Sequence, residues 1–330
     1  MPVNISAKLI ENLFDPKIPQ EPTRMGYGDG LKELGDTNPD VVALCADLTG
    51  STQTKKFADA YPGRFVQMGV AEQNLASVAS GMAAAGKIPY IASYTMFCPG
   101  RAWEQVRTTI CYNDQPVKIA GAHAGVSVGP DGATHQAIED IAIMRCLPNM
   151  QVFAPCDKIE TKKVTMALAS TGKPAFFRFA REKTPVFTSE STPFKIGKAQ
   201  IFWEGSDVAI VACGPLAYKA LQAAKDLEAD GVSCMVVNNT SIKPMDEALL
   251  IDAARRCGAV VTVEEHQVMG GMGSRVAEIL VENYPVPMQF VGVHDRFGES
   301  GEPEELIEAF GMGVGAIKEA VKKVLTRKNI

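Results

Sequence analysis

Short apolar runs alternate with longer segments of helical periodicity along the first half of the chain. The apolar runs predict strands, and the segments between them predict helices. We expect strands at 41–45, 65–68, 88–92, 117–121, 151–155 and 175–179, and helices near 24–35, 72–85, 101–113, 137–146 and 157–171. Because the strands are continuously apolar and alternate with helices, they predict a mostly parallel sheet with helices on both faces.

The second half repeats this pattern on a smaller scale. Strands are expected at 207–213, 232–237, 259–264 and 288–293, and helices near 215–229, 246–256, 271–284 and 313–326. Residues 181–206 contain two prolines, several Ser and Thr residues and no long period, which is typical of a connection between domains. The fold class is therefore α/β with two open, mostly parallel sheets. We expect an N-terminal arm (1–22), a first domain (23–185), a linker (186–206) and a second domain (207–330).

Composition and charge exclude several classes of protein. The 330 residues are 46% hydrophobic and 22% charged, as in a well-packed globular protein. A net charge of -5 argues against a nucleic-acid partner, which usually calls for a basic patch. Neither a signal peptide at 1–22 nor an apolar run long enough for a membrane span is evident. The eight scattered cysteines predict buried, reduced thiols and a cytoplasmic protein.

The first stretch with candidate chemistry is GVAEQN (69–74). Glu72 follows a strand and opens a helix, where a carboxylate also suits the helix dipole without any further role. The helix that follows is rich in Ala, Ser and Gly, so it can pack closely against another subunit. A glutamate entering such an interface would be desolvated and its proton affinity would rise, as an acid–base role requires.

Two further stretches follow strands that we expect to end at the same sheet edge. Tyr94 and Phe97 come after the strand at 88–92; they are either ordinary core or a flat surface for a heteroaromatic ring. The glycine-rich loop 121–136 holds two of the four histidines of the chain, together with Asp131. Because ligands of open parallel sheets bind at the carboxyl ends of the strands, these residues and Glu72 predict one site.

Together these stretches resemble the transketolase family. The resemblance runs from about residue 22 to the carboxyl terminus and covers the pyrimidine-binding and carboxyl-terminal domains of that family. The domain that binds the diphosphate of thiamine diphosphate and its metal has no counterpart here. The segment GYGDG (26–30) looks like part of that metal motif, but it precedes a helical stretch and has no asparagine near 52–60, so we interpret it as unrelated. The chain thus resembles the second subunit of a split transketolase.

The resemblance implies roles for individual residues. Glu72 matches the glutamate that hydrogen-bonds the aminopyrimidine, with Tyr94 and Phe97 stacking on that ring and Asp47 approaching the cofactor. The substrate-binding residues implied are Arg24, Ser51, His123, Asp131, His135 and Arg181. His135, like Glu72, is an implied catalytic residue. No metal ligand is expected on this chain, so thiamine diphosphate and Mg²⁺ would be shared with the partner.

The resemblance leaves the subfamily open. Tyr94 stands where many relatives have phenylalanine, and GVAEQN lacks the histidine that commonly follows the glutamate. The alternatives are the beta subunit of a 2-oxoacid dehydrogenase, a 1-deoxyxylulose-5-phosphate synthase-like enzyme, and a non-catalytic scaffold. His123 with Arg24 and Arg181 favours a phosphorylated sugar. The implied activity is transfer of a two-carbon ketol unit between sugar phosphates, in a heterotetramer of two copies of each subunit.

Overall fold

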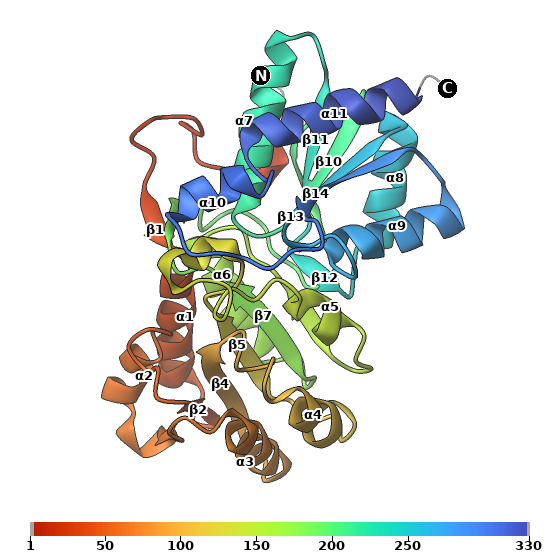
Figure 1. Ribbon diagram of the computed structural model, residues 1–330. Helices are drawn as coiled ribbons and strands as arrows, with labels where there is room; N and C mark the ends of the chain where they lie inside the picture. Colours follow the sequence, from red (N-terminus) through yellow and green to blue (C-terminus); the bar gives the residue numbers. More distant parts are fainter. Residues whose placement is uncertain (1–2, 329–330) are drawn as a thin grey trace.

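The computed structural model describes residues 3–328, which form two sheets, each with its own covering helices, arranged one above the other in Figure 1. The larger sheet has seven strands in the order β12-β6-β7-β5-β4-β2-β3, and all pair in parallel except β12. Its strands are β2 (Val41–Cys45), β3 (Phe65–Gln67), β4 (Ile88–Tyr94), β5 (Lys118–Ala122), β6 (Gln151–Phe153), β7 (Ala175–Phe179) and β12 (Ser241–Lys243). The predicted class of fold is confirmed.

Helices cover both faces of this sheet, because alternate residues of its strands point to opposite sides. One face packs on α1 (Thr23–Thr37), α2 (Lys55–Ala60) and α6 (Lys158–Leu168). The other packs on α3 (Glu72–Ala84), α5 (Asp140–Arg145) and a helix that begins as α4 (Trp103–Gln105) and continues with π-helical bonding over Val106–Cys111. The near-continuous apolar strands are therefore buried on both sides, as their sequences predict.

The smaller sheet has five strands in the order β14-β13-β10-β11-β9, of which only β9 is antiparallel to its neighbour. Its strands are β9 (Gln200–Trp203), β10 (Val208–Ala212), β11 (Cys234–Asn238), β13 (Val260–Gln267) and β14 (Met288–Val293). Its helices are α7 (Leu216–Ala229), α8 (Glu247–Cys257), α9 (Met272–Asn283), α10 (Pro303–Ala309) and α11 (Val314–Lys328). The glycine-containing segments 270–275 and 311–315 lead into α9 and α11.

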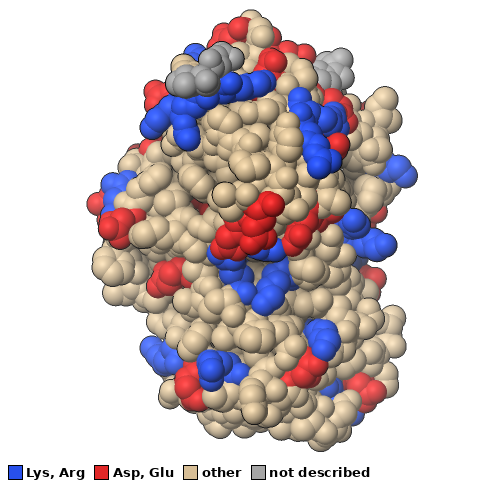
Figure 2. Space-filling view, turned by 90° about the vertical axis from the view of Figure 1, so that its right-hand side faces the viewer, with Lys and Arg blue, Asp and Glu red and all other residues tan. Residues whose placement is uncertain are grey.

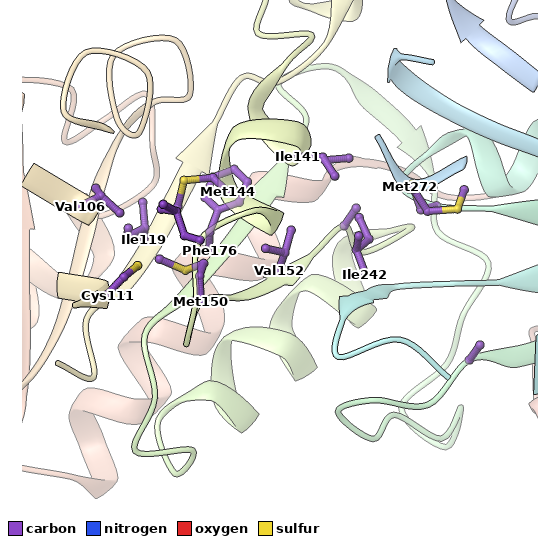
Figure 3. Close-up of a cluster of buried hydrophobic side chains, with 14 of the residues drawn as sticks. Val106, Cys111, Ile119, Ile141, Met144, Met150, Val152, Phe176, Ile242 and Met272 are labelled. Carbon is purple, nitrogen blue, oxygen red and sulfur yellow. The ribbon is translucent and has the colours of Figure 1, made fainter. Parts of the chain in front are cut away.

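One cluster of buried apolar side chains contains residues of both sheets. Met144 and Phe176 of the first sheet region belong to the same buried cluster as Ile242 and Met272 of the second half (Figure 3). A buried polar contact reinforces this junction: the Ile141 amide donates to Nε2 of the fully buried His266 at 3.1 Å. The two halves are thus joined by packed contacts as well as by the chain.

The segment expected to be a featureless connection differs from the prediction. Residues 183–185 form β8 (Lys183–Pro185), which pairs with β1 (Gln20–Pro22), and residues 200–203 form β9. The arm before β1 also packs: the Tyr218 hydroxyl donates to the Leu13 carbonyl at 3.0 Å. These strands have three or four residues, too few to give a periodic signal. The limits 23–185 and 207–330 remain our proposed domain boundaries.

The segment GYGDG lies inside α1 and not in a phosphate-binding turn. A methyl group at Gly26 would lie 2.0 Å from the Lys158 carbonyl oxygen, so this glycine lets α1 approach α6 closely. The interpretation of GYGDG as unrelated to metal binding is consistent with this packing role. All eight cysteines are free, and every one but Cys146 is buried.

Candidate functional site

The predicted site residues gather at the carboxyl ends of β2, β4, β5 and β7. These four strands are parallel neighbours in the first sheet, so the segments that follow them share one edge. Ser51 lies in the loop after β2, Tyr94 ends β4, His123 follows β5, and Arg181 follows β7. This is the edge at which open parallel sheets bind ligands.

Glu72 is buried at the start of α3, with 2% of its surface exposed. Its Oε2 accepts a hydrogen bond of 2.7 Å from Arg101 Nη1, and its Oε1 lies 3.4 Å from Ser93 Oγ. The Arg101 side chain is half exposed, and its Cζ stands 4.8 Å from the centre of the Phe97 ring. The Glu72 carboxylate and the Phe97 ring therefore both contact the same guanidinium. A carboxylate and an aromatic ring are the two groups expected to bind an aminopyrimidine.

Four rings form a continuous aromatic group beside Glu72. Tyr94 and Phe97 have nearly parallel planes, 11° apart, with centroids 6.2 Å from each other. His123 stacks on Tyr94 at 4.0 Å, and His135 meets the edge of Phe97 at 5.3 Å. These contacts bring the residues expected to hold a cofactor ring next to the two histidines expected to face the substrate.

His123 has the character of a neutral hydrogen-bond donor. Burial, aided by the charge of Arg24, lowers its pKa to about 3, so the ring is uncharged at neutral pH. Its Nε2 lies 3.4 Å from Arg24 Nη1, which can only donate, so Nε2 is the acceptor and the proton is assigned to Nδ1. Nδ1 is buried and has no hydrogen-bond partner among residues 3–328. An oxygen of a bound molecule would satisfy this orphaned group.

Arg24 is a partly buried cation that forms no ion pair with an acidic side chain among residues 3–328. Its Nη1 donates to the Ser51 carbonyl at 2.9 Å, and its Nε is buried and has no acceptor among the same residues. Burial lowers its pKa, and the positive charge of Arg181 lowers it further. Two neighbouring guanidinium groups and an unused N–H favour an anion such as phosphate, which arginine binds well.

Arg181 and Asp131 form an ion pair at this edge, with Nη1 and Oδ1 3.1 Å apart. Arg181 also lies 3.4 Å from Glu182, and both of its acidic partners are partly exposed. An exposed ion pair of this kind contributes little stability. The pair can therefore open at small cost when an anion competes for the guanidinium.

The backbone is unusual at two of the predicted positions. Asp47 has φ of 59° and His123 has φ of 58°, in the left-handed region that non-glycine residues seldom adopt. Such conformations concentrate at ligand sites. The Asp47 amide donates to Gln67 Oε1 at 2.8 Å, which fixes the loop, but within residues 3–328 no hydrogen bond or ion pair links the Asp47 carboxylate to the others.

The sequence did not single out the residues that support this site. Arg101 pairs with Glu72, and Gln136 and Glu265 hold the loop that carries Asp131 and His135. Arg101 follows Phe97 by four residues in a turn that precedes α4, so no helical spacing could signal its pairing with Glu72. Glu265 lies 138 residues from its partner Ser127, so no local pattern could reveal it.

Comparison with known proteins identifies the family. A family model described as the transketolase pyrimidine-binding domain matches residues 20–186, and one described as the transketolase C-terminal domain matches residues 197–317. The chain therefore belongs to the transketolase family and resembles the C-terminal section of split transketolases.

Individual relatives make the resemblance to split subunits specific. A Methanocaldococcus jannaschii protein, provisionally named a transketolase C-terminal section, is 41% identical over 92% of this chain and 96% of its own length. A 6-deoxy-6-sulfo-D-fructose transketolase subunit of Clostridium is 39% identical over 96% of this chain and 98% of its own length. The structure titled as a split gene transketolase, inactive beta4 tetramer, is 49% identical, covers 93% of this chain and 99% of its own, and has a TM-score of 0.88.

Three observations bear on nucleic acid, metal ions and membranes as partners. Lys and Arg side chains stand in small groups beside Asp and Glu, with no broad basic field on the face seen in Figure 2. Among residues 3–328, no group of three or more His, Cys, Asp or Glu side chains is arranged to hold a metal ion. In the same range, no helix combines the length and apolar character that crossing a membrane requires.

Proposed function

We propose that this chain is the pyrimidine-binding subunit of a split transketolase. It would transfer a two-carbon ketol unit from a ketose phosphate such as xylulose 5-phosphate to an aldose phosphate such as ribose 5-phosphate. The observation that carries the proposal is that two pairs of residues lie next to each other: Glu72 with Phe97, and the partly buried Arg24 with the buried His123. The stack of Tyr94 on His123 connects them.

The residues present fit one half of thiamine diphosphate. Glu72 would bond to a ring nitrogen of the aminopyrimidine and hold a proton there, while Phe97 and Tyr94 would pack on the ring and Asp47 would line its edge. When bound, thiamine diphosphate supplies the chemistry that breaks and forms the carbon–carbon bond. The diphosphate and Mg²⁺ are assigned to a partner subunit, for which this chain would provide only the facing surface.

The substrate half would be formed by residues of this chain. Arg24 and Arg181 would bind the phosphate, assisted by the neighbouring Ser51. His123 would donate from Nδ1 to a substrate oxygen, and Asp131 with His135 would contact the hydroxyl groups. The partly exposed His135, whose Nδ1 lies 2.9 Å from the Thr134 hydroxyl, would exchange a proton with the substrate.

A reconstitution experiment tests this proposal. The chain is mixed with a candidate partner that carries the diphosphate-binding domain, then with thiamine diphosphate, Mg²⁺, xylulose 5-phosphate and ribose 5-phosphate. Sedoheptulose 7-phosphate is expected only when both chains are present. Turnover by this chain alone would contradict the requirement for a partner, and turnover of a 2-oxoacid without sugar transfer would contradict the substrate assignment.

The assembly and the sugar can be tested in the same preparation. Two copies of each subunit are expected, because a site built between two domains is completed twice around a twofold axis. Mass measurement of the mixture in solution would detect this heterotetramer. A sulfonated sugar belongs in the substrate panel, because a sulfonate is also an anion that paired arginines can bind.

A further inference from the structure

The loop at 125–136, which carries Asp131 and His135, is held from outside the first sheet. Its only regular structure is a pair of short 3₁₀ turns over Val126–Asp131, kinked at Gly129. No strand of the first sheet lies within it. The Asp131 and His135 side chains contact Arg181 and Phe97 of the first half, but the two ends of the loop are bonded to β13 and to the segment 294–303 that follows β14, both in the second half of the chain.

Glu265 of β13 holds the beginning of the loop. Its Oε1 accepts a hydrogen bond of 2.7 Å from the backbone amide of Ser127, and 7% of the Glu265 surface is exposed. Gly125 allows this approach, because it has φ of +90° and a methyl group there would lie 2.2 Å from Glu265 Oε1. A buried carboxylate bonded to a backbone amide is a strong, directional contact.

Gln136 holds the end of the loop. Its Nε2 lies 3.0 Å from the Val126 carbonyl and 2.9 Å from the Glu299 carbonyl, and only 2% of its surface is exposed. The first contact joins the two ends of the loop, and the second joins the loop to the segment 294–303. The amide group therefore acts as a bridge between the loop and the second half.

We propose that Glu265 and Gln136 are positioning residues that set where Asp131 and His135 stand relative to the substrate. The second half of the chain would then serve the reaction by supporting this loop. This inference rests on the proposed function for its kinetic consequence, but the support of the loop can be measured independently of any turnover.

The test compares two neighbouring glutamates of β13. Glu265→Ala removes the acceptor of the Ser127 amide, whereas Glu265→Gln retains a side-chain oxygen in the same place. Glu264→Ala is the matched control, because Glu264 is also buried but accepts from the amides of Met272 and Gly273 at the start of α9. Gln136→Met, of similar volume, tests the other end of the loop and keeps the inference testable if Glu265→Ala does not fold.

Hydrogen exchange of the free subunit is the first measurement. Glu265→Ala and Gln136→Met should each speed exchange in residues 125–136 by about tenfold, the loss of one buried hydrogen bond to a charged or amide group. Exchange rates in 125–136 should be nearly the same in Glu265→Gln as in the unchanged chain. Glu264→Ala should instead speed exchange at the start of α9. Exchange in 125–136 that is the same in all these proteins would overturn the inference.

Kinetics of the assembled complex is the second measurement. Glu265→Ala should raise the KM for the sugar phosphate and lower kcat, with the affinity for thiamine diphosphate unchanged and partial recovery in Glu265→Gln. If loop exchange rises but KM and kcat do not change, the positioning role is wrong. If the unchanged complex transfers no ketol unit, the proposed function fails, while the exchange result still decides whether Glu265 and Gln136 hold the loop.

Discussion

Arg101 covers Glu72: its guanidinium donates to the carboxylate at 2.7 Å and also lies against the Phe97 ring. Arg101 thus contacts the same carboxylate and aromatic side chain that we assign to the aminopyrimidine. Arg101→Ala should destabilise the free subunit by about 1 kcal/mol, because Glu72 loses a charged partner that is itself half exposed to water. Urea unfolding measures this loss.

The contribution of this ion pair can be isolated with a double-mutant cycle. In a Glu72→Gln background the charge attraction is already gone, so Arg101→Ala should cost clearly less than in the unchanged chain. Equal costs in both backgrounds would mean that Arg101 acts only through its packing on Phe97.

Replacing Glu72 tests whether the assembled enzyme depends on it. Glu72→Ala should lower turnover about 10²- to 10⁴-fold, the usual contribution of a positioned acid–base group. Glu104→Ala is a suitable control, because this exposed glutamate of α4 bonds only to Gln105 and Thr108 nearby. Undiminished turnover with Glu72→Ala would exclude the proton-handling role. If the complex with the unchanged chain shows no turnover, the non-catalytic scaffold is favoured.

The depressed pKa of His123 predicts how acid affects the fold. Because the pKa is about 3 in the folded chain and about 6.5 in the unfolded chain, the unfolded state binds more protons between these values. Stability should therefore fall as the pH falls through 6.5, by on the order of 2 kcal/mol at pH 5 from this group alone. Urea midpoints of the unchanged chain and of His123→Asn, compared at pH 7 and pH 5, would measure the difference.

Nitrogen chemical shifts give a direct check on the same group. The His123 ring should remain neutral from pH 8 to pH 5, with the proton on Nδ1. A ring that titrates near pH 6.5 would contradict both the pKa and the assigned hydrogen-bond pattern.

The buried Lys118 predicts that stability also depends on pH in the alkaline range. Burial at the start of β5 lowers its pKa to about 7, although its Nζ donates to Thr171 Oγ1 at 3.1 Å. The unfolded chain binds more protons between about pH 7 and 10.5, so stability should rise with pH through this window, by on the order of a few kcal/mol in total. Lys118→Met should flatten this rise in urea-unfolding measurements; an unchanged slope would show that Lys118 is charged when folded.

The sequence predicted those parts of the fold and site that leave a local signal. Every strand of the first half with five or more residues was expected within two residues of where it lies, because buried parallel strands are continuous apolar runs. The short strands β9 and β12 were missed, whereas the equally short β3 and β6 were predicted, because β9 and β12 join the sheet edges antiparallel and stand outside the alternation of parallel strands with helices. Their pairing is decided by contacts with distant segments.

The candidate site shows the same division. Glu72, Tyr94, Phe97 and His123 each follow a recognisable strand, so the common edge could be inferred from the topology of parallel sheets. The ion pair of Arg101 with Glu72 and the bond from Ser127 to Glu265 could not, because each depends on where two remote segments meet. The orphaned Nδ1 of His123 likewise depends on packing in three dimensions.

The strand β12 has a consequence for how this chain can be divided. It belongs to the second half in sequence, yet Ser241 pairs with Phe153 of β6, and the Lys243 ammonium donates to the Arg145 carbonyl at 3.0 Å. A cut within 186–206 followed by separate expression would leave β6 as an unpaired edge, which invites pairing between molecules. Unlike a pair of independent modules, the two sheets therefore form one unit of folding and of expression.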